Sequence, residues 1–100
     1  MRVVLLGQTE EDLRWLNVYY DHFFPEGRKL AWRRIHNSIR LLQINPAIGK
    51  PYIALPKRRH VVPKTPFVIY YQAIGDRLEI LRIWDTRRNI EHLTIDNSES

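Results

Sequence analysis

The sequence predicts a small α+β domain in which a helical hairpin packs on a small antiparallel sheet, in the order β-α-α-β-β-β. Apolar residues recur at helical spacing over two stretches in the first half of the chain. Runs rich in aromatic and β-branched residues dominate residues 58–84. A chain of 100 residues, 44% hydrophobic and without cysteine, supports one core held by packing alone. We therefore expect a single domain over residues 1–95, followed by a frayed polar tail at residues 96–100.

The first strand and the first helix are predicted from the N-terminal residues. Arg2 to Leu6 is an apolar run containing two valines, typical of a strand buried on both faces. Thr9 then offers a hydroxyl N-cap, with Asp12 completing a shortened capping box three residues later. The helix continues as an apolar stripe at helical spacing, formed by Leu13, Leu16, Tyr20 and Phe23. It is expected to end at Phe24, before Pro25-Glu26-Gly27.

A second helix follows at once. Its stripe is formed by Ala31, Ile35, Ser38 or Ile39, and Leu42, and it ends before Asn45-Pro46. Because about three residues join the two helices, they must lie antiparallel. The stretch from Ala47 to Pro56 lacks any period and contains Gly49, so we expect a loop there.

Three strands are predicted after this loop, at Arg58 to Val62, Phe67 to Ala73 and Leu78 to Trp84. Gly75-Asp76 tolerates the positive φ of a two-residue hairpin turn. That turn sets four opposing pairs on one face: Ala73 with Leu78, Tyr71 with Ile80, Ile69 with Arg82, and Phe67 with Trp84. The other face carries Val68, Tyr70, Leu81 and Ile83, and we expect it to contact the helices. The aromatic face with Arg82 is then expected to be a partly hydrated concave surface.

The charge distribution favours an anionic partner. The chain has a formal charge of +5, and residues 27–50 contain six Lys or Arg but no Asp or Glu. Such basic segments favour polyanions or an acidic protein. A solvated helix face and a lysine-rich sheet edge explain the same charges, and both interpretations stay open. No apolar run reaches the roughly 18 residues that cross a bilayer, so we expect a cytoplasmic protein with no membrane association.

Several catalytic motifs are missing. The sequence has no phosphate-binding loop, no Gly-x-Gly-x-x-Gly and no His-Glu-x-x-His. Its four histidines lack ligand spacing, so we expect no metal and no cofactor. Arginine forks can neutralise a phosphodiester without a metal ion, and the sheet aromatics can stack bases. These aromatics equally fit the cover of a small core. Arg82, inside a strand, needs a partner nearby to escape an unpaired-charge penalty.

Four sequence motifs resemble, in order and spacing, the RelE/ParE superfamily of toxins from bacterial toxin-antitoxin modules. They are Leu42-x-x-Asn45-Pro46-x-x-Gly49, Pro66-Phe67-Val68-Ile69-Tyr70-Tyr71, Ile80-Leu81-Arg82-Ile83-Trp84 and Arg87-Arg88-Asn89. The resemblance covers nearly the whole chain. It implies a growth-inhibiting toxin encoded beside an acidic antitoxin that wraps it in a toxin-antitoxin hetero-oligomer. RelE-like members are metal-independent endonucleases that cut mRNA on the ribosome, whereas ParE-like members poison DNA gyrase.

The sequence departs from the nuclease pattern in two places. Val68 stands three residues before Tyr71, where several mRNA-cleaving relatives carry an arginine. Trp84-Asp85-Thr86 replaces the His-Tyr of one nuclease branch, and no tyrosine follows Tyr71. The ParE-like side is therefore favoured, with DNA gyrase as the expected partner. A ribosome-dependent mRNA endonuclease, and a non-toxic family member that only binds its antitoxin, stay as alternatives.

The resemblance also suggests which residues form the sites. Residues expected to bind the target are Arg58, Arg59, Tyr71, Arg82, Trp84, Arg87 and Arg88. If the protein is a nuclease, the candidate catalytic residues are Lys57, Arg58, His60, Lys64, Arg82 and Arg87, with His92 as another possible proton donor. The antitoxin is expected in a groove between the helical stripe and the sheet. Tyr19, Tyr20 and Phe23 line that groove, and Arg33, Arg34 and Arg40 rim it.

Overall fold

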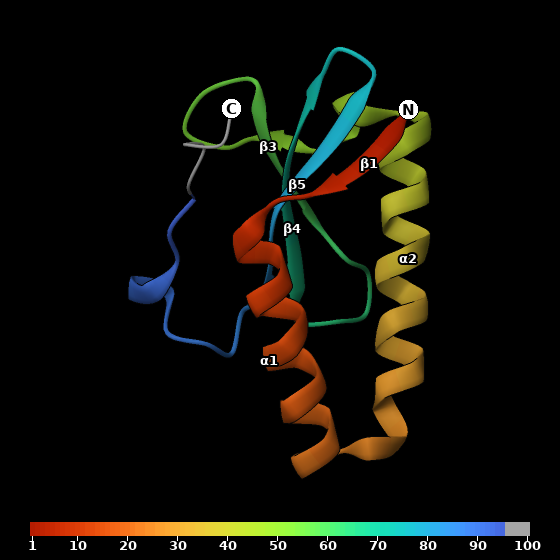
Figure 1. Ribbon diagram of the computed structural model, residues 1–100, viewed down its shortest axis with the longest axis vertical. Coiled ribbons are helices and arrows are strands. Elements are labelled where there is room, and N and C mark those ends of the chain that lie inside the picture. Colours follow the sequence, from red (N-terminus) through yellow and green to blue (C-terminus); the bar gives the residue numbers. More distant parts are fainter. Residues whose placement is uncertain (96–100) are drawn as a thin grey trace.

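The computed structural model, which describes residues 1–95, confirms the α+β fold class (Figure 1). Two antiparallel helices, α1 (Gly7–Phe23) and α2 (Arg28–Ile44), pack on a five-stranded sheet with the order β1-β5-β4-β3-β2. The strands are β1 (Arg2–Leu5), β2 (Lys50–Pro51), β3 (Lys57–Val61), β4 (Phe67–Ile74) and β5 (Arg77–Asp85). Short 3-10 turns are η1 (Pro25–Gly27), η2 (Pro46–Ile48) and η3 (Ile90–His92). The predicted tail at 96–100 lies outside the described residues.

The sheet is mixed, which corrects the all-antiparallel prediction. β1 runs parallel to β5, while the other neighbouring strands are antiparallel. β1 forms one edge of the sheet and is exposed or half-buried along its length. The expectation of a strand buried on both faces was wrong, because at this edge of the sheet the two faces of β1 are only partly covered. Neither described helix has the length and hydropathy that a membrane span requires.

The β4–β5 hairpin turns at Gly75 and Asp76 as predicted, and Gly75 has the positive φ of 60° that this turn needs. Near the turn, Ala73 pairs with Leu78 and Tyr71 with Ile80, also as predicted. A bulge between Tyr70 and Tyr71 then shifts the register by one residue on β5. In consequence, Ile69 pairs with Ile83 and Val68 with Trp84, so the predicted pairs of Ile69 with Arg82 and of Phe67 with Trp84 were wrong.

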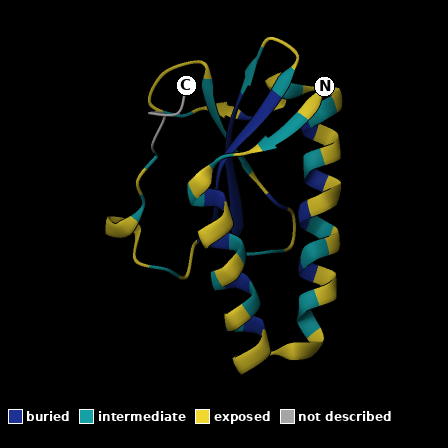
Figure 2. Cartoon of the chain, in the orientation of Figure 1, coloured by how far each residue is buried: buried dark blue, intermediate teal, exposed yellow. Residues whose placement is uncertain are grey.

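The two faces of the sheet are also assigned the other way round. Phe67, Ile69 and Tyr71 face the helices and pack in the main core with Leu16 and Ile35. The opposite face forms a second core from Val68, Tyr70, Leu81 and Trp84, which is covered by Leu6, Tyr52, Leu93 and Ile95. Of the residues predicted to contact the helices, only Ile83 does so. The bulge turns the side chain of Ile83 to the helix face of the sheet. Both faces of the central hairpin are therefore buried (Figure 2), and no hydrated aromatic face exists in the described residues.

Candidate functional site

Arg82 is a buried cation that binds a carboxylate of its own chain. Its Nε donates to Asp12 Oδ2 at 2.8 Å, and its Nη2 donates to Asp12 Oδ1 at 2.7 Å. The remaining nitrogen, Nη1, donates to the backbone carbonyl of Thr94 at 2.8 Å. Arg82 is 4% exposed. The expectation that Arg82 presents its charge to a target or substrate is therefore corrected, because all three guanidine nitrogens donate inside the fold.

Asp12 has a different role from the predicted helix cap. α1 begins at Gly7, earlier than predicted, so Thr9 and Asp12 lie inside the first two turns. Thr9 Oγ1 donates to the Ile80 carbonyl at 2.9 Å, and Asp12 Oδ2 accepts from the Ile83 amide at 3.0 Å. Asp12 Oδ1 also accepts from Arg88 Nη1 at 2.9 Å. These polar groups thus tie the start of α1 to β5 in place of capping the helix.

The two arginines after β5 contact the aromatic residues of α1. Arg87 forms an ion pair with Asp85 at 2.5 Å, and hydrogen bonding to this carboxylate raises the pKa of Arg87 above its ordinary value. The Arg87 guanidinium also lies 4.1 Å from the Tyr19 ring centroid. The Arg88 guanidinium lies 4.2 Å from the Trp84 ring and 5.1 Å from the Trp15 ring. Both arginines therefore join the end of β5 to α1, and both are paired with carboxylates.

Tyr71 and Trp84, expected on a target-binding surface, are fully buried. The Tyr71 hydroxyl donates to the Pro46 carbonyl at 2.7 Å and accepts from the Gly49 amide at 2.9 Å. Burial raises the pKa of Tyr71. Tyr71 thereby fixes η2 and Gly49 against the sheet, which gives the Asn45-Pro46-x-x-Gly49 motif a structural role. The expected surface location of both rings was wrong. Tyr71 lies in the main core on the helix side of the sheet, and Trp84 lies in the second core, which Tyr52 and the C-terminal segment cover.

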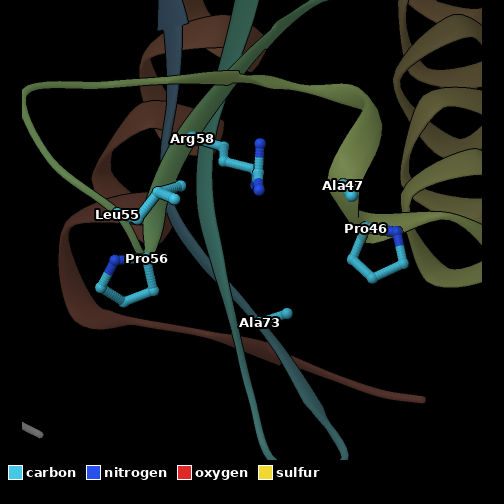
Figure 3. Close-up of a pocket in the computed structure, with 6 residues that line it drawn as sticks. All are labelled: Pro46, Ala47, Leu55, Pro56, Arg58 and Ala73. Atoms are coloured by element: carbon cyan, nitrogen blue, oxygen red, sulfur yellow. The ribbon is translucent and has the colours of Figure 1, made fainter.

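The basic residues of β3 are half-buried and contact different neighbours. Arg58 Nη1 donates to the Gly49 carbonyl at 2.9 Å and lines a cavity of about 260 Å³ next to Pro46 and Ala47 (Figure 3). His60 Nε2 lies 3.3 Å from Ser38 Oγ on α2, and burial lowers the pKa of His60 below 6.5. Arg59 and His60 line a separate cavity with Ile48 and Lys50.

The six candidate catalytic residues fall into two groups. Lys57, Arg58, His60 and Lys64 belong to β3 and the turn that follows it. Arg82 and Arg87 lie on and after β5, where Asp12 and Asp85 hold them. His92 lies exposed in η3. Within residues 1–95, no three His, Asp or Glu side chains gather closely enough to hold a metal ion.

The main core fills most of the space between the helices and the sheet, where the antitoxin groove is expected. A cavity of about 170 Å³ lies next to it, lined by Tyr20 and Arg34 among other residues. Tyr20 is buried there and its ring lies 6.3 Å from that of Phe67. Tyr19 is half-buried, whereas Phe23 is 68% exposed on the outer side of α1.

The three arginines predicted to rim that groove lie on two sides of α2. Arg34 Nη1 donates to the Lys64 carbonyl at 2.8 Å, in the turn between β3 and β4. Arg40 instead lines a cavity with Val3 of β1. Helical spacing places Arg33 on the same side as Arg40.

The antiparallel helices, the mixed sheet and the Asn45-to-Gly49 segment bound to Tyr71 define a small basic α+β domain. The family model for the ParE toxin of the type II toxin-antitoxin system parDE matches residues 3–90. The chain therefore belongs to this toxin family, which confirms the resemblance seen in the sequence.

One solved structure, described as the chromosomal ParDE TA system from P. aeruginosa, has the same fold. It superimposes with a TM-score of 0.69 at 24% sequence identity, and the match covers 83% of this chain and 92% of that chain. A comparison with curated protein sequences found no significant match.

Proposed function

We propose that this type II toxin inhibits growth by poisoning DNA gyrase and that a cognate acidic antitoxin neutralises it in the cytoplasm. The observation that carries the proposal is the engagement of Tyr71 and Arg82 inside the fold. The Tyr71 hydroxyl bonds to Pro46 and Gly49, and the three nitrogens of Arg82 bond to Asp12 and Thr94. Because both side chains hydrogen-bond within the fold, they are not free to act on an RNA substrate. A toxin of this kind is better suited to act by binding its target than by cleaving RNA.

The chemistry of RNA cleavage supports this choice. Metal-independent cleavage needs a base within hydrogen-bond reach of the 2′-hydroxyl and donors aimed at the developing phosphate charge. Val68 occupies the place of the arginine found in several nucleolytic relatives, and its side chain is buried in the second core. His60 faces Ser38 of α2, on a different element from Arg82 and Arg87.

The target-binding role is proposed for the cations that keep exposed surface, namely Arg58, Arg59, Arg87 and Arg88. The side chain of Arg87 remains 40% exposed while it is bound to Asp85. An ion-paired arginine retains further donors, so it can contact an acidic protein surface at its outer edge.

Two assays with the purified protein test the target. In a gyrase supercoiling assay we expect loss of supercoiling and accumulation of cleaved DNA. In a translation extract read by primer extension we expect no new mRNA ends. Normal supercoiling at stoichiometric excess would contradict the proposal, and new mRNA ends would establish the endonuclease alternative. Unimpaired growth of a bacterial host that expresses the folded protein alone would identify a family member that only binds its antitoxin.

The antitoxin role has its own test. Arg33, Arg34 and Arg40 are proposed to attract an acidic antitoxin to α2, which carries no acidic residue. Replacing Arg33 and Arg40 by Glu should slow association, most visibly at low salt, because salt screens exposed charges. An unchanged association rate at low ionic strength would remove these two residues from the interaction.

A further inference from the structure

The middle of the chain has no acidic residue to balance its cations. Between Glu26 and Asp76 the sequence contains no Asp or Glu. This stretch includes α2 and β3, and in the described part of the chain only its first arginine, Arg28, forms an ion pair, with Asp21. The other ion pairs join residues outside the stretch. Apart from Arg28, the cations of α2, β2 and β3 therefore have no ion-pair partner among residues 1–95, unlike those at the end of β5.

Two adjoining cavities lie within this basic region, between α2 and β3. The first, of about 230 Å³, is lined by Arg34 and Leu41 of α2 and by Lys64 of the β3–β4 turn. The second, of about 270 Å³, is lined by Ile48, Lys50, Arg59 and Val61. Ser38 lines the first cavity and His60 the second, and the polar atoms of their side chains lie 3.3 Å apart. We call these two neighbouring cavities together the α2–β3 groove.

The groove combines exposed aliphatic side chains with cations. Leu41 is 46%, Ile48 is 38% and Val61 is 53% exposed. Arg34, Lys50, Arg59 and Lys64 surround them, and no acidic residue lines either cavity. Lys64 has a φ of 59°, in the left-handed region that non-glycine residues rarely adopt, and its carbonyl is held by Arg34. A strained backbone conformation held by a hydrogen bond fixes the rim of the groove in place.

The side chains of the groove fit a protein segment better than a nucleic acid. Single-stranded nucleic acids bind to grooves in which aromatic rings stack on the bases. Neither cavity is lined by Phe, Tyr or Trp. An amphipathic acidic segment, in contrast, can bury aliphatic side chains against Leu41, Ile48 and Val61 while its carboxylates face the four cations.

We propose that the α2–β3 groove is the docking site of an acidic, leucine- or isoleucine-bearing segment of the antitoxin. This inference rests on the proposed antitoxin role and adds the place of contact. Complementary charges across such a surface give orientation and association rate, while the buried aliphatic contacts slow dissociation. In contrast to the ion-paired arginines that tie α1 to β5, the cations of the groove form no ion pair with a carboxylate of residues 1–95.

The test measures binding of the full chain to the purified product of the adjoining antitoxin gene, by biolayer interferometry at physiological salt. The variant Lys50→Glu/Lys64→Glu is expected to weaken binding by about tenfold or more, because it reverses two groove charges. The matched control Arg14→Glu/Lys29→Glu makes the same change in net charge at exposed residues outside both cavities. We expect that control to weaken binding by less than about threefold.

A second pair of variants tests the aliphatic contacts without a change in charge. Leu41→Ala/Val61→Ala is expected to raise the dissociation rate by about fivefold or more. Val18→Ala, at an exposed position on α1, serves as its control. Circular dichroism shows whether each variant keeps its fold before binding is measured.

Four results would overturn the inference. Equal weakening by both charge-reversal variants would mean that affinity follows net charge and not the groove. Antitoxin binding that is unchanged in the groove variants, with the unmodified chain binding well, would place the antitoxin elsewhere and leave the proposed function intact. A loss of binding to a 16-nucleotide oligothymidylate, with antitoxin binding retained, would identify the occupant as nucleic acid. If the unmodified chain binds no antitoxin, the proposed antitoxin role itself fails, and this inference fails with it.

Discussion

Arg82 and Asp12 form a two-point ion pair across 70 residues of sequence, with Nε to Oδ2 at 2.8 Å and Nη2 to Oδ1 at 2.7 Å. The pair links the middle of β5 to the second turn of α1, and the Asp12 carboxylate is fully buried. Arg88 and the Ile83 amide donate to the same carboxylate. Asp12 is therefore the point at which the helical hairpin is fixed to the sheet.

Removing the carboxylate should leave Arg82 buried without a counter-charge. Asp12→Ala is expected to lower the free energy of unfolding by about 3–5 kcal/mol, measured by urea denaturation. Glu11→Ala changes the exposed neighbouring carboxylate and should cost less than about 0.5 kcal/mol. The double variant Asp12→Leu/Arg82→Met should lose less free energy of unfolding than Asp12→Leu alone, because it leaves no buried charge without a partner. If the Asp12→Ala variant is as stable as the Glu11→Ala control, the ion pair does not contribute to the stability of the fold.

Gly49 has no room for a side chain. A Cβ at this position would lie 2.4 Å from the Tyr71 hydroxyl and 2.8 Å from the Arg59 carbonyl. Gly49→Ala is therefore expected to lower the free energy of unfolding by about 1–3 kcal/mol, through a clash and the loss of two hydrogen bonds. The cost should be smaller in a Tyr71→Phe background, because one clashing atom is gone. Additive effects in this double-mutant cycle would mean that the two residues do not act through the same contact.

The half-buried imidazole of His60 should make the free energy of unfolding depend on pH. Burial lowers the pKa of His60 below 6.5, so the unfolded chain binds a proton at higher pH than the folded chain does. Neutral His60 therefore costs the folded state nothing above pH 6.5. As the pH falls from 6.5 toward the lowered pKa of the folded state, protonation of His60 favours the unfolded chain and the free energy of unfolding falls. We expect the free energy of unfolding to fall between pH 7 and pH 5, and His60→Gln to flatten that slope. An identical slope in both proteins would assign the effect to other groups.

Arg87 and Tyr19 are expected to stabilise each other through the cation–π contact and the hydrogen bond from Arg87 Nη1 to the Tyr19 hydroxyl. A double-mutant cycle of Arg87→Ala and Tyr19→Ala should give a coupling energy of about 0.5–1 kcal/mol for this half-exposed pair. Arg14→Ala in the same cycle provides an exposed cation on α1 as a control. No measurable coupling would show that solvent competes fully with the contact.

The local elements followed from the sequence because they depend on neighbouring residues. The apolar spacing of Leu13, Leu16 and Tyr20 predicted α1, and Asn45-Pro46 marked the end of α2. Gly75-Asp76 predicted the hairpin turn and the first pairs beyond it. The sequence also indicated that Arg82 needs a partner, since a charge inside a strand is costly when unpaired. Asp12 was not identified as that partner, because its position also suits a helix cap.

The faces of the sheet, by contrast, were decided by the tertiary structure. A single extra residue at the bulge beside Tyr70 reverses side-chain parity along the rest of β5, and no residue type near it marks the position. Leu93 and Ile95 cover the second face, so aromatic residues that alternate along the strands are buried on both sides. The sequence by itself determined the helices, the hairpin turn, the basic charge and the toxin family, since these depend on local spacing and composition. Which cations remain unpaired was set only when the chain folded: Asp12, distant in sequence, reaches Arg82 and Arg88, whereas no carboxylate of residues 1–95 lines the α2–β3 groove.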